Sequence, residues 1–90
     1  MRPIRWTTEA ADQFEEAIKH IQQDSPHPAQ KVARAVIDRV EQLASFSGLG
    51  RPGEVTGTRE LVSPPYVVVY RSTEEAIEIL HFWHGAQDWR

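Results

Sequence analysis

The fold of this chain is decided near its C-terminal end, where residues 58–84 read TRELVSPPYVVVYRSTEEAIEILHFWH. Apolar and β-branched residues alternate with polar ones in this stretch, which is typical of β-strands. The pattern predicts three strands, over residues 58–62, 66–71 and 76–84. Prolines at positions 64 and 65 separate the first two strands, and the polar residues 72–75 predict a short turn before the third. We therefore expect sequential antiparallel pairing.

The predicted sheet is apolar on both faces. A turn centred on residues 73–74 assigns to one face Tyr66, Val68, Tyr70, Ile77, Ile79 and His81. The opposite face then carries Val67, Val69, Arg71, Glu78, Leu80 and Phe82. A sheet with two apolar faces needs two covering layers, and the rest of the chain has helices enough for one. We expect a partner to cover the other face.

Two amphipathic helices precede the strands. Between residues 7 and 24, the apolar positions that recur at helical spacing are Ala11, Phe14, Ile18 and Ile21. The second helix carries a stripe made of Ala29, Val32, Val36, Val40 and Leu43. Ile4 and Trp6 alternate around Arg5 and predict a short first strand. The expected fold is α+β, in which an N-terminal helical hairpin packs on a three- to four-stranded antiparallel sheet in the order β-α-α-β-β-β.

Length and composition limit the possible functions. A chain of 90 residues forms one domain over residues 1–90, because half of it could not bury a useful core. The chain has no cysteine, which excludes disulfides and thiolate-bound metals. Its formal charge of −3 means that binding to nucleic-acid phosphates would need a local basic patch. The sequence has no signal-peptide pattern and no apolar run long enough to cross a bilayer, so we expect a cytoplasmic protein.

Two apparent motifs carry no chemistry. Residues 48–53 match the dinucleotide-binding pattern G-x-G-x-x-G, but a helix precedes them and a strand follows, which is the reverse of the order that phosphate binding requires. We therefore expect a helix-to-strand loop. His81 and His84 lie an odd number of residues apart on one strand and point to opposite faces, so no shared metal site is expected.

A series of short motifs resembles a known family. After the two helices come G-T-R-E-L at 57–61, Y-V-V-V-Y-R at 66–71 and H-G-A-Q-D-W at 84–89. Their order and spacing resemble the RelE/ParE superfamily of bacterial toxins over nearly the whole chain, and the ParE-like members most. The resemblance implies the toxin of a type II toxin–antitoxin module. It also implies neutralisation by a cognate antitoxin, ParD-like or related, within a toxin–antitoxin hetero-oligomer.

The superfamily divides into two kinds of activity. RelE-like members cleave messenger RNA on the ribosome, whereas ParE-like members are linked to inhibition of DNA gyrase. RelE-like ribonucleases typically carry lysines in the strand corresponding to residues 58–61 and an arginine where this chain has Val67. We therefore expect a ParE-like toxin that binds gyrase without catalysis, cofactor, metal or direct contact with nucleic acid. The alternatives are a RelE-like endoribonuclease using Arg59, Arg71 and His84, and a non-toxic binding module.

The resemblance also suggests two sets of binding residues. The candidates for binding the target are Arg59, Arg71, His84, Gln87, Asp88 and Trp89. The candidates for binding the antitoxin are Phe14, Ile18, Tyr66, Val68 and Tyr70. Each also has a structural interpretation, since the two arginines can pair with nearby glutamates and the aromatic residues can belong to the core.

Overall fold

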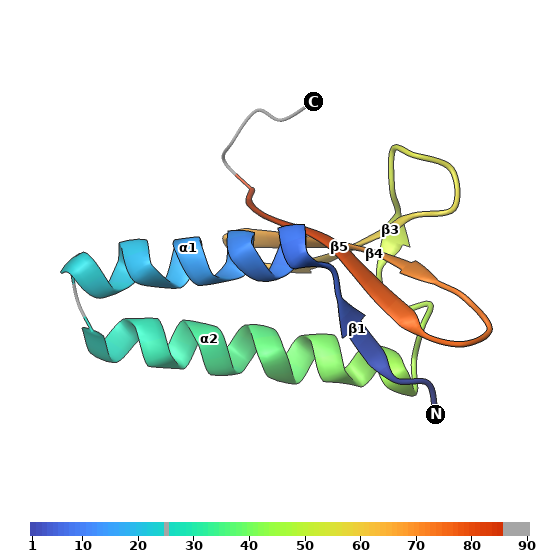
Figure 1. Ribbon diagram of the computed structural model, residues 1–90, viewed down its shortest axis with the longest axis horizontal. Coiled ribbons are helices and arrows are strands. Elements are labelled where there is room, and N and C mark those ends of the chain that lie inside the picture. The colour runs from blue at the N-terminus through green and yellow to red at the C-terminus, as the bar shows by residue number, and fades with distance from the viewer. Residues whose placement is uncertain (25, 86–90) are drawn as a thin grey trace.

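The computed structural model describes residues 1–24 and 26–85, which form two helices and five strands (Figure 1). The helices are α1 (Thr8–Asp24) and α2 (Pro26–Glu41), and a 3₁₀ turn, η1 (Gln42–Ala44), extends the second. The strands are β1 (Ile4–Trp6), β2 (Arg51–Pro52), β3 (Arg59–Ser63), β4 (Tyr66–Ser72) and β5 (Ile77–His84). The predicted α+β fold, with a helical hairpin packed on a sheet, is confirmed.

The sheet differs from the prediction in size and direction. Its five strands lie in the order β1-β5-β4-β3-β2, and the pairs β2·β3, β3·β4 and β4·β5 are antiparallel. Strand β1 pairs with β5 in parallel, so the sheet is mixed rather than antiparallel. After β1 the chain forms the helical hairpin and returns to the sheet at β2, on the opposite edge. The following strands lead back across the sheet, so the last strand, β5, lies beside the first strand, β1.

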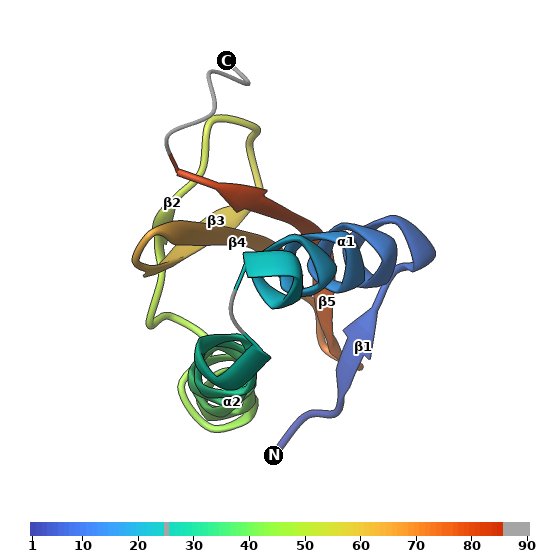
Figure 2. The same cartoon turned by 90° about the vertical axis from the view of Figure 1, so that its left-hand side faces the viewer.

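Both helices cover the same face of the sheet (Figure 2). The core between the layers is formed by Ala10, Val36, Val40, Leu43, Leu61, Tyr66, Val68, Tyr70, Ile77, Ile79 and Phe82. Every strand residue in this set belongs to one face by its pairing register. In the part of the chain that the structure describes, no helix lies on the opposite face.

A β-bulge changes the predicted faces of β5. Val69 pairs with His81 while Tyr70 pairs with Ile79, so Leu80 has no partner in the register. Phe82 consequently lies with Val68 on the helix-covered face and is 3% exposed. The prediction that put Phe82 and Val68 on different faces of the sheet, and His81 on the core face, was wrong. Strict alternation along β5 does not allow for the extra residue of the bulge.

Helix α1 is attached to β5 at two points. The Thr7 hydroxyl accepts a hydrogen bond from the amide of Ala10 (3.1 Å) and donates one to the carbonyl of Ile79 (2.9 Å), so it caps the helix and holds it to the strand. One turn later, Gln13 Oε1 accepts the amide hydrogen of Phe82 at 2.8 Å. This orientation buries Ala10 and leaves Ala11 exposed, in contrast to the predicted stripe.

Residues 48–53 belong to the connection between η1 and β3 and contain the short strand β2. This agrees with the predicted helix-to-strand loop. It packs against the centre of β4, where the Tyr70 hydroxyl contacts both Gly50 and Ser47. Among residues 1–24 and 26–85, neither helix combines the length and apolar character needed to cross a membrane.

Candidate functional site

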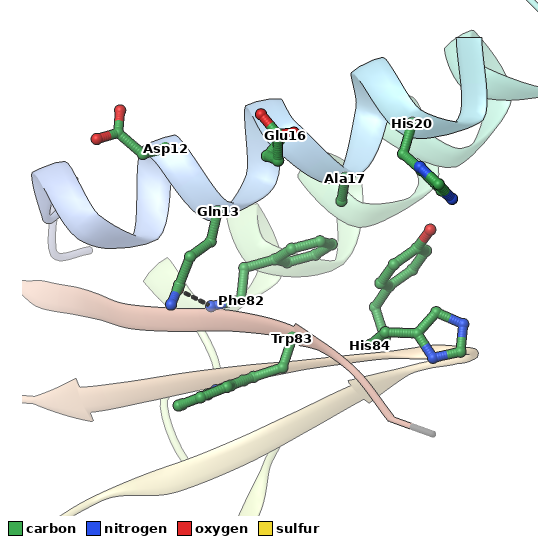
Figure 3. A pocket seen from close by; sticks show the side chains of 9 residues that line it. Asp12, Gln13, Glu16, Ala17, His20, Phe82, Trp83 and His84 are labelled. Atoms are coloured by element: carbon green, nitrogen blue, oxygen red, sulfur yellow. Dashed lines mark hydrogen bonds between the residues drawn. The ribbon is translucent and has the colours of Figure 1, made fainter. Parts of the chain in front are cut away.

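A groove of about 780 Å³ lies between α1 and the end of the sheet where β5 finishes (Figure 3). It is lined by Asp12, Gln13, Glu16, Ala17, His20, Tyr66, Phe82, Trp83 and His84. One wall is a single helix and the other is formed by two neighbouring strands. The groove is only partly enclosed, whereas small-ligand sites bury most of their ligand, so it suits a chain segment better.

The floor of the groove is aromatic. The rings of Tyr66 and Phe82 stack with their centroids 4.9 Å apart, and His84 meets Tyr66 edge-on at 5.4 Å. Burial raises the pKa of the Tyr66 phenol above its ordinary value, because the ionised form would lose its hydration. The floor is therefore formed by two largely buried rings, and the phenol of Tyr66 stays neutral at physiological pH.

The rim of the groove carries charge. Asp12 and Glu16 are exposed on α1 along one side, and His20 follows one turn further along the helix (Figure 3). In the sequence analysis these three residues were not recognised as part of a site. Their spacing of four residues, at positions 12, 16 and 20, places them on one helix face. This spacing is the sequence feature that could have indicated a shared surface.

The five candidates for antitoxin binding fall into different environments. Val68 and Tyr70 are fully buried under the helices, so they present no surface to a partner in this fold. Phe14 packs between Trp6 and Phe82, with ring centroids 5.4 and 5.2 Å away, and also contributes to the core. Tyr66 lines the groove but is only 6% exposed, and Ile18 is half-buried on α1, outside both the core cluster and the groove lining.

The candidate target-binding arginines have separate local partners. Arg59 donates to the carbonyl of Gly50 through Nε (3.0 Å) and Nη2 (2.8 Å), and to that of Gly48 at 3.3 Å. Arg71 donates through Nε and Nη2 to Glu78 Oε1, at 3.0 and 2.8 Å. Arg59 is thus hydrogen-bonded to the loop at residues 48–50, whereas the side chain of Arg71 is 52% exposed to solvent.

The remaining target candidates lie at or beyond the end of β5. His84 is the last residue of that strand and pairs with Tyr66, the first residue of β4. Arg71 lies five residues further along β4, about 17 Å away at the usual rise per residue. Gln87, Asp88 and Trp89 lie outside the described residues. Within residues 1–24 and 26–85, no three His, Asp or Glu side chains come close enough to hold a metal ion.

Comparison with known proteins identifies the family. The family model described as the ParE toxin of type II toxin–antitoxin system, parDE, matches residues 4–89. The chain belongs to this family. It is thus a toxin of the type II toxin–antitoxin class, within the wider ParE/RelE superfamily that the sequence motifs indicated.

Relatives of this ParE-family chain match it along most of its length. The protein Y4kP of Sinorhizobium fredii is 38% identical over 88 residues, covering 96% of this chain and 91% of its own. Toxin RelE2 of Caulobacter vibrioides is 29% identical over 87 residues, covering 97% of this chain and 99% of its own. The solved chromosomal ParDE toxin–antitoxin system of P. aeruginosa superposes with a TM-score of 0.83 at 28% identity, covering 93% of this chain and 96% of that one.

Proposed function

We propose that this ParE-family toxin inhibits DNA gyrase by binding to it, without making or breaking a covalent bond. The observation that carries this proposal is the separation of Arg59, Arg71 and His84, the candidate catalytic residues. His84 and Arg71 lie at opposite ends of β4 and β5, about 17 Å apart along the strand. Arg59, on β3, is committed to two loop carbonyls.

Cleavage of RNA by its own 2′-hydroxyl makes strict geometric demands. A base must take the hydroxyl proton, an acid must protonate the leaving oxygen, and cations must stabilise the charge that develops on phosphorus. All of these groups must contact a single phosphate. Arg59, Arg71 and His84 cannot do so together, and this supports action by binding.

We also propose that the groove along α1 accepts a segment of the cognate antitoxin. The aromatic floor at Tyr66 and Phe82 suits apolar side chains, and the acidic rim at Asp12 and Glu16 suits a lysine or arginine. The solved relative that comprises both toxin and antitoxin, the ParDE system, supports a partner of this kind. Of the antitoxin candidates, Tyr66 lines this groove, whereas Ile18 does not.

One induced culture tests the proposed target. The full chain is expressed without its antitoxin, plasmid supercoiling is followed on gels, and cellular messenger RNA is mapped by primer extension. We expect relaxed plasmids, a DNA-damage response and intact messages. Inhibition of purified gyrase by the purified chain would then establish direct action.

The same culture examines the second candidate, a ribosome-dependent messenger RNA endonuclease. The relative named toxin RelE2 is the observation that favours it. Cleavage within codons, with supercoiling unchanged, would overturn the gyrase proposal.

The antitoxin site is tested separately by Glu16→Lys, which should weaken the antitoxin complex. Glu15→Lys, on the neighbouring helix face, is the matched control.

A further inference from the structure

Strand β5 is longer than the strand that pairs with its outer edge. Strand β1 pairs only with Ile77–Ile79, whereas β5 continues to His84 and pairs with β4 along that further length on its inner side. After Trp6 the chain turns into α1. In the part of the chain that the structure describes, no strand therefore lies beside the outer edge of β5 beyond Ile79. Such an edge presents backbone N–H and C=O groups with which another strand can pair.

A side chain of α1 occupies part of this edge. Gln13 Oε1 accepts the backbone N–H of Phe82 at 2.8 Å, where a neighbouring strand would offer a carbonyl (Figure 3). The N–H of Phe82 thus points away from β4, and in an extended strand the carbonyl of the same residue points the same way. Phe82 is 3% exposed, so an incoming strand reaches these groups by displacing the Gln13 side chain. This exchange replaces one hydrogen bond by another of the same kind.

The groove between α1 and β5 follows the same edge. Three consecutive strand residues, Phe82, Trp83 and His84, line it. Successive side chains of a strand point to opposite faces of the sheet, so a cavity lined by all three does not lie on one face alone. Gln13, which bonds to the outer edge of β5, lines the groove as well. The groove therefore gives a chain segment access to the backbone of this edge.

The walls of the groove indicate the side chains of an occupant. Asp12 and Glu16 are exposed on α1, and none of the lining residues that the structure describes is a lysine or arginine. Trp83 points to the other side of β5 from Phe82, and its half-buried indole packs on His81 with ring centroids 4.6 Å apart. An extended segment directs alternate side chains to these two sides. Basic residues facing α1, alternating with apolar residues facing the indole, complement the two walls.

We propose that an extended segment of the cognate antitoxin adds to the sheet as a further strand, along the outer edge of β5 beyond Ile79. This inference rests on the proposed antitoxin site and names the conformation and chemistry of the segment that fills it. The segment displaces Gln13, accepts the Phe82 N–H with one of its own carbonyls, and carries lysine or arginine at the alternate positions nearest Asp12 and Glu16. In strand addition, backbone pairing supplies affinity and the alternating side chains supply specificity.

Hydrogen exchange at the Phe82 amide, followed by NMR, tests this pairing. In free Gln13→Ala the amide loses its acceptor, so it should exchange about tenfold faster than in the free unaltered chain. Binding of the full-length antitoxin encoded beside the toxin should slow this exchange again by about tenfold or more, because a backbone carbonyl replaces the missing oxygen. Gln22→Ala is the matched control. Gln22 is exposed on the same helix, outside the groove lining, and its replacement should leave the Phe82 amide unaffected.

A second readout separates a paired strand from a helix seated in the groove. A strand brings its backbone protons close enough to the Phe82 amide proton to give nuclear Overhauser effects between the two chains. A helix bonds its own backbone and leaves the amide of Gln13→Ala without an acceptor. In the complex of the unaltered chain, the side-chain amide signals of Gln13 should also shift as this side chain is displaced. These two readouts need no variant, so the test holds even where Gln13→Ala does not fold.

The outcomes separate this inference from the proposed function. If the unaltered chain does not bind the antitoxin, the proposed antitoxin site fails and this inference fails with it. If Glu16→Lys weakens the complex but the Phe82 amide shows no contact with the antitoxin backbone, the groove binds the antitoxin and only strand addition is excluded. Protection of the amide in free Gln13→Ala would overturn the proposal as well. Protection that grows with toxin concentration would assign the edge to a second copy, and protection independent of concentration would assign it to the chain itself.

Discussion

The hydroxyl oxygen of Tyr70 lies 2.9 Å from the backbone nitrogen of Gly50 and accepts its hydrogen bond. The same hydroxyl donates to the carbonyl of Ser47 at 2.8 Å. Tyr70 is fully buried at the centre of β4, so a single side chain joins the middle of the sheet to the loop after the second helix. Arg59 holds the same loop from outside, through the carbonyls of Gly48 and Gly50.

Removing the Tyr70 hydroxyl should destabilise the fold. Tyr70→Phe leaves the Gly50 amide and the Ser47 carbonyl without their partner, and an unsatisfied buried group costs about 1–3 kcal/mol. Urea unfolding measures the change in the free energy of unfolding. Tyr66→Phe is the matched control, because no hydrogen bond of the Tyr66 hydroxyl occurs among the described residues. An equal loss in both variants would contradict the role assigned to the Tyr70 hydroxyl.

The two glycines of this loop should differ sharply in their tolerance of alanine. A Cβ atom at Gly50 would lie 2.7 Å from the backbone oxygen of Glu60 and 2.8 Å from the Tyr70 ring and hydroxyl. Overpacking of this kind costs about 1–3 kcal/mol, so Gly50→Ala should lower the midpoint of thermal unfolding. A Cβ at Gly48 meets nothing within 4 Å, and Gly48→Ala should be neutral or slightly stabilising. Equal midpoints for the two variants would refute this account.

Local patterns predicted the elements of the fold but not all of their pairing. The alternation over residues 66–71 and the spacing of Phe14, Ile21, Val36 and Val40 reflect local geometry, which a sequence encodes directly. The bulge at Leu80 and the parallel pairing of β1 depend on how the whole sheet curves around the helices. No three-residue strand carries enough sequence to specify its direction.

The positions of the candidate residues could be predicted less completely than the fold. Tyr66, an antitoxin candidate, and His84, a target candidate, both line the groove, whereas Val68 and Tyr70 lie in the core, because apolar strand residues look alike whether a helix or a partner covers them. Asp12, Glu16 and His20 were missed since an exposed polar stripe on a helix is ordinarily only solvated. The register that brings Arg5 beside Glu78 joins opposite ends of the chain, which no local pattern in the sequence specifies.

The guanidinium of Arg59 should be structural rather than target-binding. Arg59→Lys keeps the charge but cannot reach the two carbonyls with a planar fork, so the loop should loosen and the free energy of unfolding should fall by about 1 kcal/mol. Gyrase inhibition, measured at a temperature where the variant is folded, should remain within about twofold of the unaltered chain. A normal unfolding curve with lost inhibition would instead assign Arg59 to the target interface.

Stability should depend on the ionisation of Tyr66 at alkaline pH. Burial raises the pKa of this phenol in the folded protein above its ordinary value of 10.0. The folded state therefore keeps the proton at a pH where the unfolded state has lost it. The contribution to stability is fully present below pH 10 and is lost as the pH rises through the folded-state pKa.

We expect the difference in unfolding free energy between the unaltered chain and Tyr66→Phe to be constant from pH 7 to about 9. Above about pH 10 it should shift against the unaltered chain. Urea titrations at each pH, with phenolate absorbance recorded for both proteins, measure this difference, and a difference independent of pH would show that the phenol is not desolvated by the groove.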